Sequence, residues 1–176
     1  MRLFIGAAGR GGTFYLLRLL ELLDPRANEV HLLMDGEAKQ VATQEVHAFR
    51  VPLGITQHTE NDVDAALLTT VSRFDAMVLL PCSMSVVGQL AHGAGETSLA
   101  QAAAKFLAQR RKFILVPGET PWNLIQARNI VTVLEAGAVV MPASPSFRGN
   151  PKSMNDLTDT LILAIMEQLR LTPYRS

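Results

Sequence analysis

The stretch Phe74-Asp-Ala-Met-Val-Leu-Leu-Pro-Cys-Ser-Met-Ser85 decides the fold, because its apolar run stops at a proline and gives way to small polar residues. Residues 77–80 have the length and continuous apolarity of a β-strand that is buried on both faces. In an open parallel sheet, ligands bind in the crevice beyond the carboxyl ends of the strands. We therefore expect Cys82, Ser83 and Met84 to lie at a binding site.

The composition limits the classes of protein to which the chain can belong. Its 176 residues fit one domain over 1–176 with a sizeable core, and 16 basic residues balance 16 acidic residues. This balance gives no reason to expect nucleic acid or an anionic membrane as a partner. The apolar runs are shorter than the roughly 20 residues of a membrane span, and the N-terminus lacks the pattern of a signal peptide.

A single cysteine excludes an internal disulfide and suits a reducing cytoplasm, which is the predicted location. The histidines, the cysteine and the carboxylates show no metal-ligand spacing, so no metal site is predicted. Hydrophobic residues make up 48% of the chain. This share indicates either apolar surface buried between the subunits of a homo-oligomer or a large core.

Strand and helix patterns alternate along the whole chain. Strand patterns cover residues 3–5, 29–34, 74–80, 113–117 and 138–141. Helical patterns cover residues 15–23, 38–45, 62–71, 83–92, 99–109, 124–136 and 155–171. We expect an α/β fold of three layers, in which right-handed crossovers join the strands of a doubly wound parallel sheet. Residues 46–61 are predicted to form a loop.

A glycine-rich segment follows the first strand pattern. Gly6-Ala-Ala-Gly-Arg-Gly-Gly12 leads into a helical pattern that Thr13 is predicted to cap. Glycines allow a ligand close to the backbone, and the free amides at a helix start favour phosphate. The spacing is not the G-x-G-x-x-G of dinucleotide-binding proteins, so a tight turn without a ligand is an alternative. Arg10 either neutralises an anion here or faces water.

Three of the strand patterns end in proline, at Pro81, Pro117 and Pro142. In a parallel sheet these ends lie at one edge, so Gly118-Glu-Thr-Pro-Trp122 should open on the same crevice as the first stretch. Glu119 is therefore placed to bond a ligand. Trp122 either offers an aromatic face to a planar substrate or anchors a subunit interface.

Three segments together resemble a known family. Pro81-Cys-Ser-Met84, Val116-Pro-Gly-Glu-Thr-Pro121 and Met141-Pro-Ala-Ser-Pro-Ser-Phe147 are similar in order and spacing to segments of the UbiX/Pad flavoproteins, the flavin prenyltransferases. The resemblance runs over essentially the full chain. It implies a flavodoxin-like, Rossmann-like domain that binds FMN at subunit interfaces in the cytoplasm. It also implies a homo-oligomer, a trimer or a dodecamer.

The resemblance further implies which residues contact FMN. Amides and hydroxyls between Gly9 and Thr13 suit the phosphate, while Ala7, Ala8 and Met84 suit the apolar ring. Ser83 would bond the polar edge of the ring. The predicted cofactor-binding residues are Ala8, Gly9, Arg10, Gly11, Gly12, Asp35, Cys82, Ser83, Met84, Ser85 and Gly118. Cys82 is not expected to act as a nucleophile, because no orienting histidine lies near it in the sequence.

Several positions depart from the pattern with which the family binds a prenyl phosphate. Gly118 replaces the arginine of V-P-R-E, and Arg148 replaces the tyrosine of F-Y-x-x-P. A serine, a lysine, an arginine and a second lysine are replaced by Gly11, Ser85, Gln101 and Ala108. Each lost charge-assisted hydrogen bond is worth roughly 1.5–3 kcal/mol, so several losses together weaken phosphate binding by orders of magnitude. Arg10, Arg128 or Arg148 could compensate in part.

We therefore expect first a redox flavoprotein. Its FMN would take electrons from an unidentified donor, and Trp122 and Arg148 would contact a planar small-molecule substrate such as a dihydropterin, as in paralogues of the dihydromethanopterin reductase type. The alternative is the family's own reaction, transfer of a dimethylallyl group to reduced FMN in support of a decarboxylase. Glu45 and Glu119 are the predicted catalytic residues, as acid–base groups. A third possibility is an FMN carrier without turnover.

Overall fold

The computed structural model describes residues 1–46, 49–60 and 71–174. Within these residues, six parallel strands form one sheet. The strands are β1 (Arg2–Ala7), β2 (Glu29–Met34), β3 (Thr56–His58), β4 (Ala76–Cys82), β5 (Lys112–Pro117) and β6 (Val139–Val140). The helices are α1 (Thr13–Leu22), α2 (Gly36–Glu45), α5 (Met84–Ala91), α6 (Ser98–Ala108), α7 (Leu124–Glu135), α8 (Met154–Leu169) and the short 3₁₀ helix η2 (Val71–Arg73).

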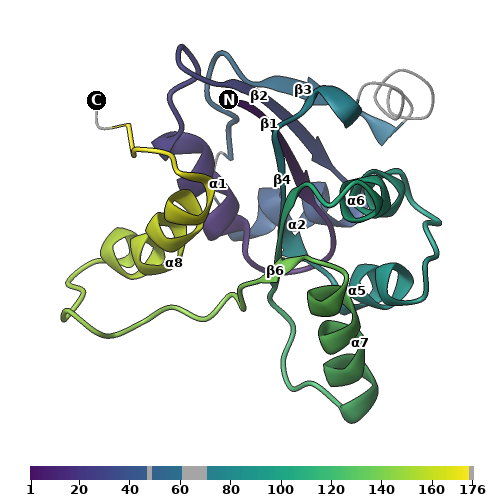
Figure 1. Ribbon diagram of the computed structural model, residues 1–176. Coiled ribbons are helices and arrows are strands. Elements are labelled where there is room, and N and C mark those ends of the chain that lie inside the picture. Colours follow the sequence, from purple (N-terminus) through teal and green to yellow (C-terminus); the bar gives the residue numbers. More distant parts are fainter. Residues whose placement is uncertain (47–48, 61–70, 175–176) are drawn as a thin grey trace.

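Helices cover both faces of the sheet, as the alternating patterns predict. Figure 1 shows α1 and α8 on one side of the strands and α5, α6 and α7 on the other. Two hydrophobic clusters fill the spaces between these layers. The three-layer α/β architecture expected from the sequence is confirmed.

Alternate residues of the central strands enter opposite clusters. In β1, Leu3 and Ile5 pack in the cluster beneath α1 and α8, whereas Phe4 packs in the cluster beneath α5 and α6. In β4, Val78 and Met77 divide in the same way. Because successive side chains of a strand point to opposite faces, a strand covered on both sides must be apolar throughout. This requirement explains the unbroken apolar run of residues 77–80.

The strand order is β3-β2-β1-β4-β5-β6, and it reverses direction between β1 and β4. Without the three-residue edge strand β3, the remaining five strands follow the order of flavodoxin. The connection that follows β1 packs on one face of the sheet, and the connection that follows β4 packs on the other face. A crevice therefore forms beyond the carboxyl ends of these two strands. The flavodoxin-like fold thus places the loops after these two strands at the usual binding position.

Two strand predictions need correction. Residues 56–58, predicted as loop, form the edge strand β3, which pairs with β2 through only three residues. The strand β4 does not stop before Pro81 but continues to Cys82. Proline is accommodated because the pairing with β5 shifts register between Leu79 and Cys82, and the Pro81 carbonyl accepts the Ala8 amide at 2.9 Å.

Two helix predictions also differ from the structure. Gly12, in a left-handed conformation, precedes α1 as its cap, and Thr13 is instead the buried first residue of the helix. The predicted helix 62–71 lies outside the described residues except for its last residue, which begins η2. In the part of the chain that the structure describes, no helix has the length and apolarity needed to cross a membrane.

Candidate functional site

Three loops meet at the carboxyl edge of the sheet, after β1, β4 and β5. A Cβ atom at Gly9 would lie 2.7 Å from the Cβ of Ser83, so these two loops are in backbone contact. A Cβ atom at Gly118 would lie 3.8 Å from the Gly11 carbonyl oxygen, so the third loop approaches the first. The structure therefore brings Gly9, Gly11, Ser83 and Gly118 together, although 109 residues separate the first from the last.

The glycine loop has a conformation that other residues rarely adopt. Gly9, Gly11 and Gly12 have φ angles of 90°, 81° and 96°. A side chain at Gly9 would also collide with Ser83, as the 2.7 Å separation shows. Glycine is thus required at this position by both the backbone angle and the contact. The result is a loop whose backbone is open to a ligand.

Two carboxylates of the chain already occupy amides of this loop. The Gly9 N–H donates to Asp35 Oδ2 at 3.1 Å, and the Thr13 N–H donates to Glu45 Oε2 at 3.3 Å. Asp35 also caps α2, since its Oδ1 accepts the Ala38 N–H at 2.6 Å. Burial raises the pKa of Asp35, although its hydrogen bonds from the two amides act in the opposite direction. Both ends of α2 thus hold the glycine loop through negative charges.

Other amides of the loop are free to bind an anion. Among the residues that the structure describes, no group accepts the N–H of Gly11 or of Gly12. These amides precede α1, whose N-terminus favours negative charge. Arg10 does not contribute here, because its Nε donates to Glu37 Oε1 at 2.6 Å and its side chain is 81% exposed. Of the two roles expected for Arg10, the structure favours the surface one.

The β4–α5 loop supplies a hydroxyl, an apolar side chain and a thiol. Ser83 caps α5, with its Oγ accepting the Val86 N–H at 3.3 Å. Met84 is buried, whereas Ser85 is exposed. Burial, assisted by the Glu119 carboxylate, raises the pKa of the Cys82 thiol well above its ordinary value. A thiol that stays protonated is a poor nucleophile, which agrees with the sequence prediction for Cys82.

The β5–α7 loop carries Glu119 and Trp122, both of which are exposed. The Trp122 indole Nε1–H donates to the Glu119 carbonyl oxygen at 2.5 Å. Glu119 directly follows Gly118, where an added Cβ atom would lie 3.8 Å from the Gly11 carbonyl oxygen. Glu119 therefore belongs to the meeting point of the loops, while the hydrogen bond fixes the Trp122 ring to its own loop.

Arg148 comes from a fourth segment of the chain, which precedes α8. It is exposed, and its backbone N–H donates to Ser146 Oγ at 3.2 Å. No contact joins its side chain to the glycine loop among the described residues. The predicted substrate residues Trp122 and Arg148 thus come from separate parts of the chain.

A cavity of about 370 Å³ lies next to the glycine loop. It is lined by Gly12, Phe14, Tyr15, Glu45, Pro145, Met154, Leu157 and Thr158. Burial raises the pKa of the Tyr15 phenol. The sequence indicated only Gly12 and Glu45 of these residues, because Tyr15 and Leu157 follow ordinary helical patterns that give no sign of a cavity. Within the described residues, no three histidine, cysteine or carboxylate groups gather as a metal site would require.

Comparison with known proteins identifies the family. Residues 1–166 match the family described as Flavoprotein. The chain is 33% identical to the flavin prenyltransferase UbiX of Thermoplasma acidophilum over 171 residues, which cover 95% of this chain and 93% of the relative. It is 31% identical to UbiX of Escherichia coli K12, with 97% and 93% covered.

Solved structures agree with these relatives. The dodecameric FMN-dependent UbiX-like decarboxylase of Escherichia coli O157:H7 matches with a TM-score of 0.89 at 28% identity, covering 98% of this chain and 95% of that one. AnUbiX (PadA1), in complex with FMN and dimethylallyl pyrophosphate, matches with a TM-score of 0.89 at 29% identity, covering 97% and 93%.

A redox protein is also similar, but only in fold. DmrB of Burkholderia xenovorans, described as a cubic protein cage for redox transfer, matches with a TM-score of 0.67 at 14% identity, over 97% of each chain. An identity this low carries no information on activity. The three proline-ended segments and the full-length matches agree, and the chain therefore belongs to the Flavoprotein family, in its UbiX/Pad branch.

Proposed function

We propose that this chain binds FMN and transfers a prenyl group from a prenyl phosphate to the flavin. One observation carries the proposal: 97% of the chain superposes, at a TM-score of 0.89 and 29% identity, on AnUbiX bound to FMN and dimethylallyl pyrophosphate. When bound, the flavin supplies the ring atoms that accept the prenyl group. The chain's own residues bind the two reactants, orient them and move protons.

The residues at the carboxyl edge fit FMN. The open glycine loop offers the amides of Gly11 and Gly12 to the phosphate. Ser83 and the buried Met84 offer a hydroxyl and an apolar surface to the flavin ring. Asp35 places a negative charge beside this loop, so the phosphate is bound less tightly than an open set of amides would allow.

The cavity beside the glycine loop fits a short prenyl group. Its walls include Phe14, Leu157 and Met154, and it adjoins the amides that we assign to FMN. Glu45 lines this cavity and Glu119 lies at the loop after β5, so each can exchange a proton near the reacting groups. We assign to these two carboxylates the acid–base role that the resemblance implies.

This chain has few cationic side chains with which to bind the prenyl phosphate. Gly118 has no side chain where the family carries arginine, and Arg148 is exposed without a contact to the glycine loop among the described residues. Arg10 is paired with Glu37. Missing charge-assisted hydrogen bonds raise the substrate concentration that the enzyme needs rather than change its reaction.

The comparisons favour prenyl transfer over the redox enzyme that we expected first. The full-length relatives near 30% identity are flavin prenyltransferases, and the similarity to DmrB reaches only the fold. Neither a dihydropterin substrate nor an electron donor finds support in them. The dodecameric relative and the FMN-bound relative instead support a homo-oligomer with FMN as its cofactor.

The test is the mass of the flavin. First, the cofactor is released from the purified protein and its mass is measured by mass spectrometry. In a separate sample, the FMN-loaded protein is reduced without oxygen and incubated with dimethylallyl monophosphate. We expect a flavin that is heavier by one dimethylallyl group. Absence of this product, together with reoxidation of the reduced flavin by a dihydropterin in stopped-flow measurements, would replace the proposal with the redox function.

A further inference from the structure

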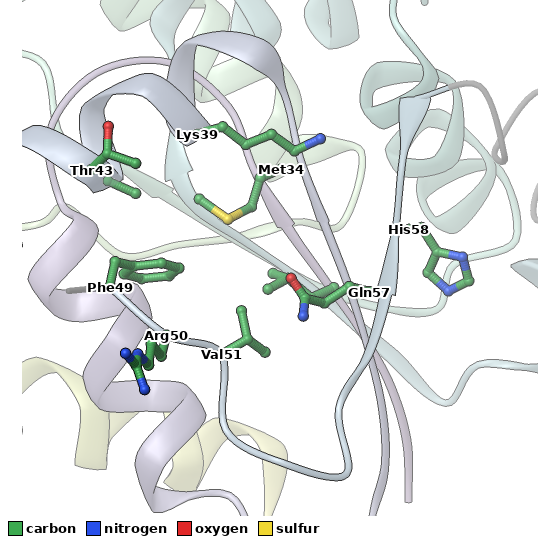
Figure 2. A pocket seen from close by; sticks show the side chains of 10 residues that line it. Met34, Lys39, Thr43, Phe49, Arg50, Val51, Gln57 and His58 are labelled. Atoms are coloured by element: carbon green, nitrogen blue, oxygen red, sulfur yellow. The ribbon is translucent and has the colours of Figure 1, made fainter.

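A second and larger cavity lies at the β3 edge of the sheet, away from the three loops. Its volume is about 510 Å³, and it is enclosed by α2, β2, β3 and residues 49–51 (Figure 2). This volume falls in the range of small-molecule sites, which is roughly 300–1,000 Å³. None of its lining residues is among those that we assign to FMN or to the prenyl group. The cavity therefore needs an explanation of its own.

The inner wall of this cavity is apolar. Leu32 and Met34 of β2 and Ala42 of α2 are buried there, and Phe49 and Val51 are half-buried against the same core. In Figure 2, Met34, Phe49 and Val51 lie around one open space. The apolar side chains around this opening leave apolar surface exposed to water. An apolar ligand would bind here because it would remove that surface from water.

The rim of the cavity is positively charged. Lys39 of α2 and Arg50 lie on opposite sides of the opening in Figure 2. Within the described part of the chain, neither side chain has a hydrogen bond or an ion pair, and no acidic residue lines the cavity. His58, which also lines the cavity, could carry a positive charge when protonated. Its ring already forms a hydrogen bond, since its Nε2 lies 2.7 Å from His31 Nδ1. Two unpaired cations over an apolar wall are complementary to an anion with an apolar body.

We propose that this cavity binds a small amphipathic anion. Its apolar body would pack on Met34, Phe49 and Val51, and its carboxylate or phosphate group would bind Lys39 or Arg50 at the rim. Gln57, which also lines the cavity, adds a side-chain amide that can donate to the same head group, whereas the Thr43 hydroxyl already donates to the Gln40 carbonyl oxygen at 2.7 Å. This site is separate from the proposed reaction and does not depend on it.

The experiment uses the protein saturated with FMN and measures binding by isothermal titration calorimetry. The probes are octyl phosphate and octanoate below their micelle concentrations, with octanol and inorganic phosphate as probes that carry only one half of the chemistry. We expect at least one of the two amphipathic anions to bind at a single site per chain. Octanol and inorganic phosphate should each bind at least about tenfold more weakly than that anion. Equal binding of octanol, or no binding of either amphipathic anion, would overturn the proposal.

Substitutions decide where the probe binds. Replacing both cations, by Lys39→Ala with Arg50→Ala, should weaken binding of the amphipathic anion by about tenfold or more. Gln57→Glu should also weaken it, because a carboxylate then faces the site. The matched control removes two exposed cations elsewhere, by Arg73→Ala with Lys152→Ala, and should leave binding unchanged. Binding that survives the loss of Lys39 and Arg50 would place the ligand in another cavity and would contradict the proposal.

Discussion

At the scale of single residues, the Asp35 carboxylate contacts the glycine loop of the proposed flavin site. It accepts the amides of Gly9 and Ala38, so it joins the glycine loop to the start of α2. The same charge lies beside the amides that remain for the phosphate of FMN. Asp35 therefore contributes to the shape of the loop while it opposes the binding of an anion.

Asp35→Asn should tighten FMN binding by about tenfold, or ~1.4 kcal/mol, which is within the repulsion expected between unit charges several ångströms apart in a partly exposed site. Asparagine retains the helix cap through its single side-chain oxygen, so the fold should persist, but it cannot also accept the Gly9 N–H. The measurement is the dissociation constant from quenching of flavin fluorescence. Riboflavin, which lacks the phosphate, is the control ligand, and an equal gain for riboflavin and FMN would refute this explanation.

The pH dependence of FMN binding follows from the same residue. Because burial raises the pKa of Asp35, its ionised form is disfavoured in the folded protein, and this penalty disappears as the pH falls through the raised pKa. Protonation also removes the charge that repels the phosphate. We expect FMN affinity to rise as the pH is lowered through this range and Asp35→Asn to flatten the rise. An unchanged pH profile in the variant would exclude Asp35 as its source.

Residue-scale features differed in how well the sequence predicted them. The glycine loop and Ser83 were predicted, because glycine spacing and a strand end are local signals. The bonds from Asp35 to Gly9 and from Glu45 to Thr13 were not, since they join residues 26 and 32 positions apart. Only the packing of α2 against the loop brings them together. The roles assigned to these residues remain predictions.

At the scale of elements, α2 connects the two proposed binding regions. Asp35 and Glu45, at its two ends, hold the glycine loop, and Lys39, Ala42 and Thr43 line the cavity at the β3 edge. The sequence predicted most of this helix but not β3, since three residues are too few for a periodic pattern. The sequence prediction also ended β4 too early. Proline interrupts a strand only where the neighbouring strand needs a hydrogen bond from its backbone amide, which proline lacks.

The packing of α8 on α1 gives an element-scale prediction. Arg18 binds Asp159 through two parallel bonds, Nε to Oδ1 at 2.6 Å and Nη2 to Oδ2 at 3.0 Å, with side chains 22% and 25% exposed. Asp159→Asn should lower the free energy of unfolding by about 1 kcal/mol and Tm by about 2–4 °C. Thermal unfolding followed by circular dichroism measures this change.

Glu21→Gln is the matched control for that prediction. Glu21 also binds Arg18, at 3.2 Å, but its side chain is 44% exposed and the pair lies within one helix. Pairs of this kind contribute about 0.3–0.5 kcal/mol. An equal loss of stability in both variants would show that the bidentate pair between α1 and α8 contributes no more to the free energy of unfolding than the exposed pair within α1.

At the scale of the whole molecule, the amino-acid composition indicated either apolar surface buried between subunits or a large core. The structure locates exposed apolar surface on α7, where Leu124, Ile125 and Val131 are 65%, 68% and 53% exposed. Contiguous apolar side chains on one exposed helix are typical of subunit contacts. The fold and family were predicted because strand and helix periods and three motifs extend over the full chain.

The reaction was harder to predict than the family. Replaced residues such as Gly118 indicated the loss of prenyl transfer, whereas the comparisons favour its retention. A missing charge is visible in the sequence, but the cavity of about 370 Å³ beside Glu45 requires α1 and the segment before α8 to be placed in space. The main function expected from the sequence was therefore the less supported of the two.

Assembly provides the prediction at this scale. Ile125→Glu should break a homo-oligomer into smaller species, because a charge buried in an apolar contact is costly. Sedimentation velocity measures the change. Leu53→Glu, at a position 94% exposed in a loop, is the control and should leave the assembly intact. A wild-type chain that sediments as a monomer would contradict the predicted homo-oligomer.

The decisive measurement is the rate of flavin prenylation by the wild type and by Gly118→Arg at a low concentration of dimethylallyl monophosphate. The backbone at position 118 has room for a Cβ atom, which would lie 3.7 Å from the Cβ of Ala143 and 3.8 Å from the Gly11 carbonyl oxygen. We predict that the wild type forms prenylated flavin and that Gly118→Arg forms it about tenfold faster, because the variant regains a phosphate-binding cation. The absence of prenylated flavin from both proteins, with FMN still bound, would contradict the account.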